Sequence, residues 1–214
     1  MTWILVRHGQ TEWNLARKFQ GQKDSALTSK GEIQVHAVAH TLAPLLNDHE
    51  DWKIFVNPLG RAQQTLGIIR QYCGLAADSI VPIDQLMECN YGDWAGLTSD
   101  QVRESFHSDW CAREADKWNY RIPGGESYSD LHARIYGWMS SFDYSTANVI
   151  VVAHEMVNRT IRGILLSLDP KSTLQFRQPN DAILLVQAGK DCLIKAAQQG
   201  ACTQPSVARA PSGE

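Results

Sequence analysis

The sequence lacks the features of several specialised classes of protein. Its five cysteines are odd in number, widely spaced and without a C-x-x-C pair, which argues against a disulfide framework or a structural zinc and for reduced thiols. No apolar run approaches membrane-spanning length, and Arg7 interrupts the first apolar stretch too early for a signal peptide. We therefore expect a cytoplasmic protein that does not act at a membrane.

An excess of basic residues is also missing. Lys and Arg number 20 against 23 Asp and Glu, which gives a formal net charge of -3 and argues against nucleic acid as a partner. If the substrate is an anion, the positive charge that attracts it must be local. The 214 residues, 43% of them apolar, suffice for one domain with a packed core and a modest cap.

Short apolar runs alternate with segments of helical spacing along the chain. The runs predict strands at residues 3–6, 53–56, 80–83, 149–153 and 182–186. The helical segments begin at Thr28, at Arg61 with Gly74 as the stop, at Leu131 and after His154. Such alternation predicts an α/β fold, a three-layer sandwich whose largely parallel central sheet is flanked by helices.

Three stretches depart from this alternation. Residues 9–27 show no helical period and contain Gly9, Asn14, Gly21 and Asp24, so we expect a long functional loop. Residues 98–120 carry aromatic residues among many charges, which predicts one or two amphipathic helices forming a small helical cap at about residues 95–125. The domain is expected to span residues 1–198, and the Gln, Pro, Ser and Gly content of residues 199–214 predicts a disordered tail.

Two predicted strands end in a histidine. His8 follows the apolar run that ends at Val6 and Arg7, and His154 follows the run at residues 149–153. Parallel neighbouring strands would place both histidines on the same edge of the sheet, where α/β proteins often bind ligands. A lone histidine at a strand end is usually only a satisfied polar residue, so the pair carries more weight than either member.

A series of motifs extends the signal along most of the chain. The sequence resembles the histidine phosphatase superfamily, which includes the phosphoglycerate mutases. The motifs, in the order of that family, are LVRHGQTEWN at 5–14, Gln20-Gly21 with Asp24, PLGRAQQT at 58–65, Glu88 with YGDWAGLT at 91–98, PGGES at 123–127, and His154.

The resemblance implies a phosphoryl-transfer site with defined roles. His8 is the nucleophile, and a neutral imidazole can form a phosphohistidine. Arg7 and Arg61 bind the phosphate with planar guanidinium groups. His154 hydrogen-bonds the phosphoryl group as an imidazolium, and Glu88 is the general acid, with a pKa that a neighbouring dianion raises. The alternatives are that Arg61 only caps surface carbonyls and that Glu88 is an exposed charge.

The expected substrate-binding residues include softer assignments. The list comprises Arg7, Asn14, Gln20, Gly21, Arg61, His154 and Glu155. Glu155 stands where glycine is common in the family, and Asn57 replaces the usual serine before Pro58. A carboxylate at the start of a helix would compete with a phosphate for the same positive potential, unless Glu155 points away or pairs with Arg159 one turn on.

The remaining motifs do not predict a metal or cofactor site. His36 and His40 are four residues apart on a predicted helix, but Ala37 stands where the zinc-protease motif has glutamate. Gly124-Gly125 lacks the rest of a dinucleotide or phosphate-loop motif. We therefore expect catalysis without a metal ion or an organic cofactor.

Three functions fit these residues. The favoured one is a phosphomonoesterase acting on a small phosphorylated metabolite, because Glu88 and Glu126 are only 38 positions apart whereas the glycolytic mutases of the family have a longer insertion there. A smaller cap excludes water less well, which favours hydrolysis. A bisphosphate-dependent phosphoglycerate mutase and a non-catalytic phospho-ligand-binding protein are the alternatives. The oligomeric state is left open, a homodimer being one option.

Overall fold

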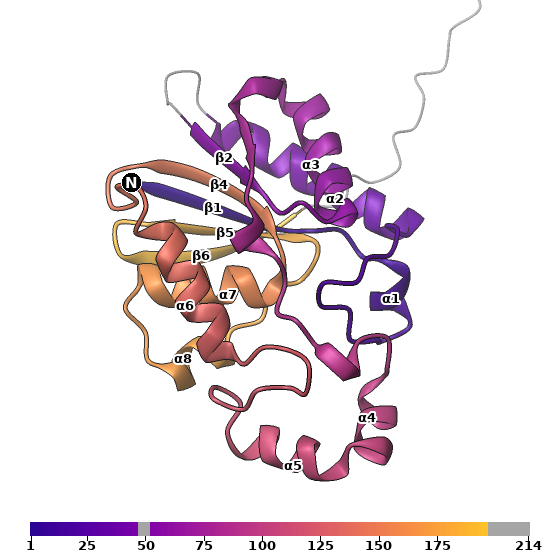
Figure 1. Ribbon diagram of the computed structural model, residues 1–214. Coiled ribbons are helices and arrows are strands. Elements are labelled where there is room, and N and C mark those ends of the chain that lie inside the picture. Colours follow the sequence, from indigo (N-terminus) through magenta and orange to yellow (C-terminus); the bar gives the residue numbers. More distant parts are fainter. Residues whose placement is uncertain (47–51, 197–214) are drawn as a thin grey trace, which may run out of the picture.

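A six-stranded mixed sheet forms the centre of the computed structural model, which describes residues 1–46 and 52–196. The strand order is β3-β2-β4-β1-β5-β6 (Figure 1). The first four strands of this order are parallel, β5 runs antiparallel to β1, and β6 at the edge runs antiparallel to β5. The predicted fold class is therefore confirmed, whereas the predicted tail at 199–214 lies outside the described residues.

The strands agree closely with the apolar runs of the sequence. β1 pairs with β4 in a register that sets Arg7 beside Ala153. The bounds are β1 Thr2–Arg7, β2 Trp52–Val56, β3 Ile80–Pro82, β4 Asn148–Ala153, β5 Ala182–Gln187 and β6 Lys190–Lys195. Because β1 and β4 are central and parallel, their carboxyl ends lie side by side.

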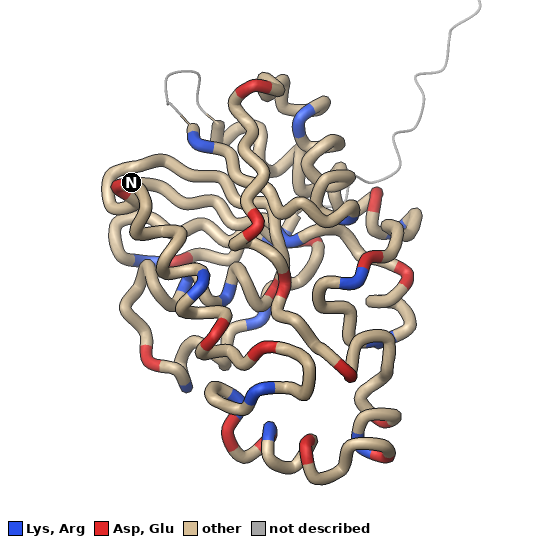
Figure 2. The backbone as a smooth tube through the Cα atoms, in the orientation of Figure 1, with Lys and Arg blue, Asp and Glu red and all other residues tan. Residues whose placement is uncertain are grey.

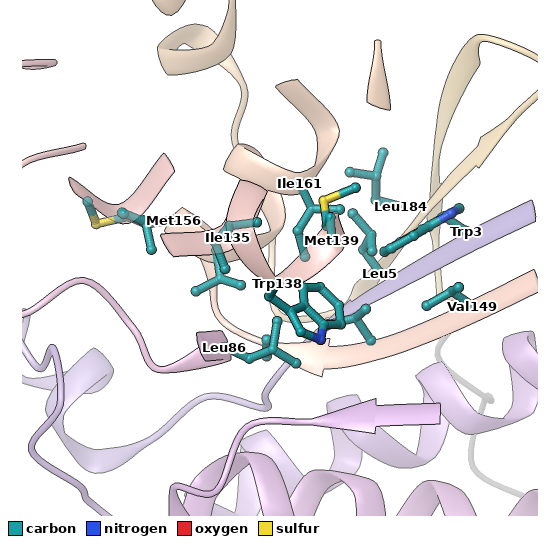
Figure 3. Packing of buried hydrophobic residues seen from close by; sticks show 14 of the residues in the cluster. Trp3, Leu5, Leu86, Ile135, Trp138, Met139, Val149, Met156, Ile161 and Leu184 are labelled. Atoms are coloured by element: carbon teal, nitrogen blue, oxygen red, sulfur yellow. The ribbon is translucent and has the colours of Figure 1, made fainter. Parts of the chain in front are cut away.

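Both faces of the sheet are buried by helices. On β1, Trp3 and Leu5 point into one hydrophobic cluster, and Ile4 and Val6 point into the other. Helices α6 (Tyr128–Met139) and α7 (Glu155–Leu165) contribute to the first cluster, part of which Figure 3 shows. Helices α2 (Ser29–Leu42) and α3 (Gly60–Cys73) contribute to the second. This alternation produces the three layers.

The cap contains two short helices away from the sheet (Figure 1). They are α4 (Ser99–Ser105) and α5 (His107–Ala115), both within the predicted interval. A separate small cluster of Trp94, Val102 and Ile122 supports them. Within residues 1–46 and 52–196, no helix is long and apolar enough to cross a membrane.

Local signals explain how several helices begin and end. Thr28 caps α2 by accepting a hydrogen bond from the Gly31 amide, and Gly74 ends α3 in the left-handed conformation at φ 68°. Helix α1 (Glu12–Leu15) is capped by Thr11 and lies within the segment predicted as a loop. Four 3₁₀ helices complete the connections: Ala43–Leu45, Ala77–Ser79, Asp84–Leu86 and Gly92–Trp94.

The sequence prediction missed α8 (Pro170–Gln175) and β6. The prediction was also wrong in treating residues 9–27 as wholly without helix, because the capping box of Thr11 and Asn14 stabilises one turn. These three elements are short or exposed and therefore carry no long apolar period.

Candidate active site

The two histidines meet at the carboxyl edge of the parallel strands. His8 follows β1 and His154 follows β4, and the His8 amide donates a hydrogen bond to the Ala153 carbonyl at 3.0 Å. Their ring centroids are 5.1 Å apart. The expected proximity of His8 and His154 is confirmed.

Hydrogen bonds define which nitrogen of His8 carries the proton. Nδ1 lies 2.7 Å from the Gly9 carbonyl, which can only accept, so Nδ1 is the protonated nitrogen. Nε2 is then unprotonated, and its lone pair accepts a hydrogen bond from Arg61 Nε at 3.3 Å. Burial, together with the charges of Arg61 and Arg7, holds the pKa of His8 well below its usual range. His8 is therefore a neutral imidazole whose Nε2 can attack an electrophile.

Close backbone packing fixes the peptide that orients His8. A Cβ added at Gly9 would lie 2.6 Å from the Gly31 carbonyl oxygen, and one added at Gly31 would lie 2.1 Å from the Gln10 carbonyl oxygen. Neither contact leaves room for a side chain. The His8–Gly9 turn therefore sits directly against the first turn of α2.

Arg61 enters the site from the first turn of α3 and is 1% exposed. Nη1 donates to the Lys23 carbonyl at 2.7 Å and to Asp24 Oδ1 at 3.0 Å, and Nη2 donates to the Gly21 carbonyl at 2.7 Å. Arg61 does bond carbonyls, that of buried Gly21 and that of exposed Lys23, but its own side chain is buried and lines the cavity of the site. One Nη2 hydrogen has no partner among residues 1–46 and 52–196 and is available to a ligand.

Arg7 is held by groups that the sequence did not reveal. Its Nη1 donates to the Gln178 carbonyl at 2.7 Å and lies 3.1 Å from Glu155 Oε2. The Gln178 side chain donates to the carbonyls of Leu5 and Ala182. Arg7 Nε is buried without a hydrogen-bond partner among the residues that the structure describes, so it is available to an anion.

Glu155 occupies the predicted position at the start of α7, but its carboxylate is shared. It pairs with Arg159 at 2.8 Å, with Arg7 at 3.1 Å and with Arg177 at 3.3 Å. Glu155 thus pairs with Arg159, which was the stated exception to its competition with a bound phosphate. Its carboxylate is therefore not an unpaired charge. Three guanidinium groups surround one carboxylate, and the cluster keeps an excess of positive charge.

Glu88 is buried at 9% exposure, so the alternative that it is a solvated charge is wrong. Oε1 accepts from the Cys89 amide at 2.9 Å, and Oε2 accepts from the Met156 amide in the first turn of α7 at 3.4 Å. Burial raises the pKa of Glu88, partly offset by the Cys89 amide and the Arg61 charge. The raised pKa favours the protonated form that a general acid needs.

His154 is fully buried and lies among positively charged groups. Burial, with Arg61, His8 and Arg7 nearby, holds the pKa of His154 well below its usual range. The expected imidazolium would need a dianionic phosphoryl group beside the ring to offset these positive charges, and it stays a prediction. Both ring nitrogens are buried without partners within the described part of the chain, which marks them as groups for a ligand.

The loop residues are placed around the same space, with unequal freedom. The Gln20 amide is engaged by Thr11 and Ser25, and Asn14 Oδ1 accepts from the Thr11 amide. Gly21 offers its carbonyl to Arg61. Asn57 is fully buried and accepts from the Leu59 amide at 2.7 Å, so it shapes the start of α3. The substrate-binding roles of Asn14, Gln20 and Gly21 stay predictions.

A cavity of about 430 Å³ connects these groups with the cap. Eight basic side chains and three glutamates line it, although Figure 2 shows that residues of both charge signs are spread over the described part of the chain. The basic residues are Arg7, Lys18, Arg61, Arg103, Arg113, Lys117, Arg159 and Arg177. The positive charge is thus local, as an anionic substrate requires. No group of three or more metal-ligating side chains occurs among residues 1–46 and 52–196.

Sequence reasoning missed several of these contributors. Gln178 carries no motif, and its role depends on the tertiary contact between β1 and the segment before β5. Arg113 and Lys117 belong to the predicted cap, but the sequence analysis did not assign them to the substrate cavity that they line. Arg159 had a readable signal, since it lies four residues after Glu155 on one helix face.

Comparisons with known proteins show similarity along most of the chain. A 2,3-bisphosphoglycerate-dependent phosphoglycerate mutase of Methylobacterium radiotolerans is 35% identical over 175 residues, 78% of each chain. A mycobacterial glucosyl-3-phosphoglycerate phosphatase solved with VO3 superposes with a TM-score of 0.74 at 25% identity, covering 92% of this chain and 98% of that one. An alpha-ribazole phosphatase from Shigella flexneri shares the fold, with a TM-score of 0.77 at 21% identity over 92% and 97% of the two chains.

The family assignment rests on the whole length of the domain. The model of the histidine phosphatase superfamily (branch 1) matches residues 3–195, which include every motif and both histidines. The chain belongs to the histidine phosphatase superfamily.

Proposed function

We propose that the protein is a metal-independent phosphomonoesterase that hydrolyses a small phosphorylated metabolite through a phosphohistidine at His8. The observation that carries the proposal is the unprotonated Nε2 of His8 at a basic cavity that also holds a buried Glu88 with a raised pKa. A nucleophile, cationic groups for the phosphate oxygens and a proton donor are the three requirements of this chemistry.

The reaction proceeds in two displacements. His8 Nε2 attacks phosphorus, the N–P bond forms, the P–O ester bond breaks, and Glu88 gives its proton to the departing alkoxide. Arg7 and Arg61 balance the charge on the phosphoryl oxygens, for which Arg7 Nε and one Arg61 Nη2 hydrogen are free. Water then attacks phosphorus, returns a proton to Glu88, and releases inorganic phosphate as the N–P bond breaks.

The first experiment traps the intermediate. The wild-type protein, given p-nitrophenyl phosphate in excess chelator, should turn over and yield an acid-labile, base-stable phosphoenzyme, and His8→Ala should not be labelled. Activity that disappears in chelator and returns with metal would contradict the proposal.

A second experiment tests the general acid. Glu88→Gln should slow the hydrolysis of phenyl phosphate, whose phenolate is a poor leaving group, by about 100-fold. It should slow the hydrolysis of p-nitrophenyl phosphate much less, because nitrophenolate leaves without a proton. Equal slowing of the two esters would remove Glu88 from this role.

The second candidate function is a bisphosphate-dependent phosphoglycerate mutase, favoured by the similarity to the 2,3-bisphosphoglycerate-dependent phosphoglycerate mutase of Methylobacterium radiotolerans. In that reaction a second hydroxyl of the bound acid, and not water, would take the phosphoryl group. Incubation with 3-phosphoglycerate, with and without 2,3-bisphosphoglycerate, separates the two. Isomerisation that depends on the bisphosphate and outruns phosphate release would reverse the ranking.

A further inference from the structure

The segment that carries Glu88 has no regular structure of its own. Residues 87–91 lie between two 3₁₀ helices, Asp84–Leu86 and Gly92–Trp94, and form neither helix nor strand. A general acid must lie within hydrogen-bond reach of the leaving oxygen. Contacts from elsewhere in the fold must therefore fix the position of Glu88.

An ion pair on α6 and its preceding turn brackets this segment. Arg134 donates through Nε and Nη2 to the two carboxylate oxygens of Glu126, at 3.1 and 2.9 Å. Its Nη1 donates to the carbonyls of Gln85 and Met87, the latter at 2.9 Å. The backbone before Glu88 is thus bonded directly to one guanidinium group.

Glu126 holds the other side of the same segment. Its Oε2 accepts from the Asn90 amide at 2.9 Å, and its own amide donates to the Asn90 carbonyl at 2.9 Å. The pair therefore fixes the chain at positions 85, 87 and 90, on both sides of Glu88. The planar fork of arginine is needed, because a lysine ammonium cannot span two carbonyls and a bidentate carboxylate together.

We propose that Arg134, with Glu126, is a positioning residue for the general acid Glu88. The inference rests on the proposed function, in which Glu88 protonates the leaving group. The side chains of Arg134 and Glu126 are 21% and 19% exposed, and partly exposed ion pairs generally contribute little to global stability. The pair makes four hydrogen bonds to the backbone at residues 85, 87 and 90, which indicates that its role is to position this segment.

The test compares leaving groups. Arg134→Gln should lower kcat/KM for phenyl phosphate about tenfold more than for p-nitrophenyl phosphate, because only the first ester needs the proton of a well-placed acid. Arg134→Lys, which keeps the charge, should show the same difference at a smaller size. Arg121→Gln is the matched control, since Arg121 forms an exposed ion pair with Asp130 on the same helix and should leave the ratio unchanged.

A double-mutant cycle separates positioning from a structural role. In the Glu88→Gln background, Arg134→Gln should produce no further difference between the two esters. A difference that persists there, or equal slowing of both esters by either Arg134 variant, would overturn the inference. If Glu88→Gln alone leaves the ratio unchanged, the general-acid assignment fails instead, and the two failures are distinguishable.

Discussion

Glu155→Gln offers a direct measure of how charge controls this pocket. Three guanidinium groups, from Arg7, Arg159 and Arg177, share the Glu155 carboxylate at 2.8 to 3.3 Å. With glutamine the shape is kept and the cluster changes from a net charge of +2 to +3. An anion that binds to Arg7 would then no longer be repelled by the carboxylate of Glu155, so the variant should bind inorganic phosphate or vanadate more tightly.

The magnitude follows from Coulomb's law. At a separation of about 6 Å and an effective dielectric of about 20, one unit charge changes the binding energy of another by about 2.8 kcal/mol before screening. Glu155 is 18% exposed, so salt and water reduce this figure, and a decrease of about tenfold in the inhibition constant, about 1.4 kcal/mol, is expected.

The assay is competitive inhibition of p-nitrophenyl phosphate hydrolysis at low and at high salt. The difference between variant and wild type should be largest at low salt, where screening is weakest. Glu104→Gln removes the same charge from the exposed surface of α4, outside the cavity lining, and serves as the control. Inhibition constants that are unchanged, or that rise, would show that Glu155 acts by holding Arg7 in place and not through its charge.

Two further outcomes are expected. Gly31→Ala should lower the free energy of unfolding by roughly 1–3 kcal/mol, because the added Cβ would collide with the Gln10 carbonyl. Gly137→Ala, also in a helix but with open space around it, should raise the free energy of unfolding by about 0.8 kcal/mol. Urea titration measures both values, and similar effects of the two variants would contradict the packing argument. The kcat/KM for phenyl phosphate should fall as pH rises through the raised pKa of Glu88, because the general acid loses its proton. Activity should persist toward acid pH, because His8 has a lowered pKa and stays neutral. If the fall at alkaline pH remains in Glu88→Gln, Glu88 is not the group that titrates.

The elements that position the site could be predicted because they are strongly periodic. β1 and β4 are almost fully buried, and buried parallel strands appear as continuous apolar runs. β6 could not be found in this way, since most of its residues are exposed. Weaker local signals did exist: Asp169 before Pro170 is a cap and first-turn pair for α8.

The chemistry of the site was predictable only in part. The family motifs locate His8, Arg7, Arg61, Glu88 and His154; the first four line one cavity, and the His154 ring lies against that of His8. Protonation could not be predicted in the same way. The charge of His154 depends on burial beside Arg61 and Arg7, which belong to distant parts of the chain.

The same reasoning applies to groups that orient the catalytic residues. Gln178 holds Arg7 through a backbone carbonyl, and any residue with a carbonyl could do so, which leaves no trace in the residue type. Arg134 acts on the main chain at residues 85 and 87. Such contacts become visible only once the tertiary structure is known.

The pairing of β1 with β4 also makes catalytic activity a reporter of folding. The two histidines are 146 positions apart in the chain, and they come together only when the first strand adds beside a strand from the last third of the domain. Loop closure over such a distance is slow compared with helix formation. During refolding, circular dichroism should recover before the proposed phosphatase activity does, and a chain with native helices but an unpaired first strand should be inactive.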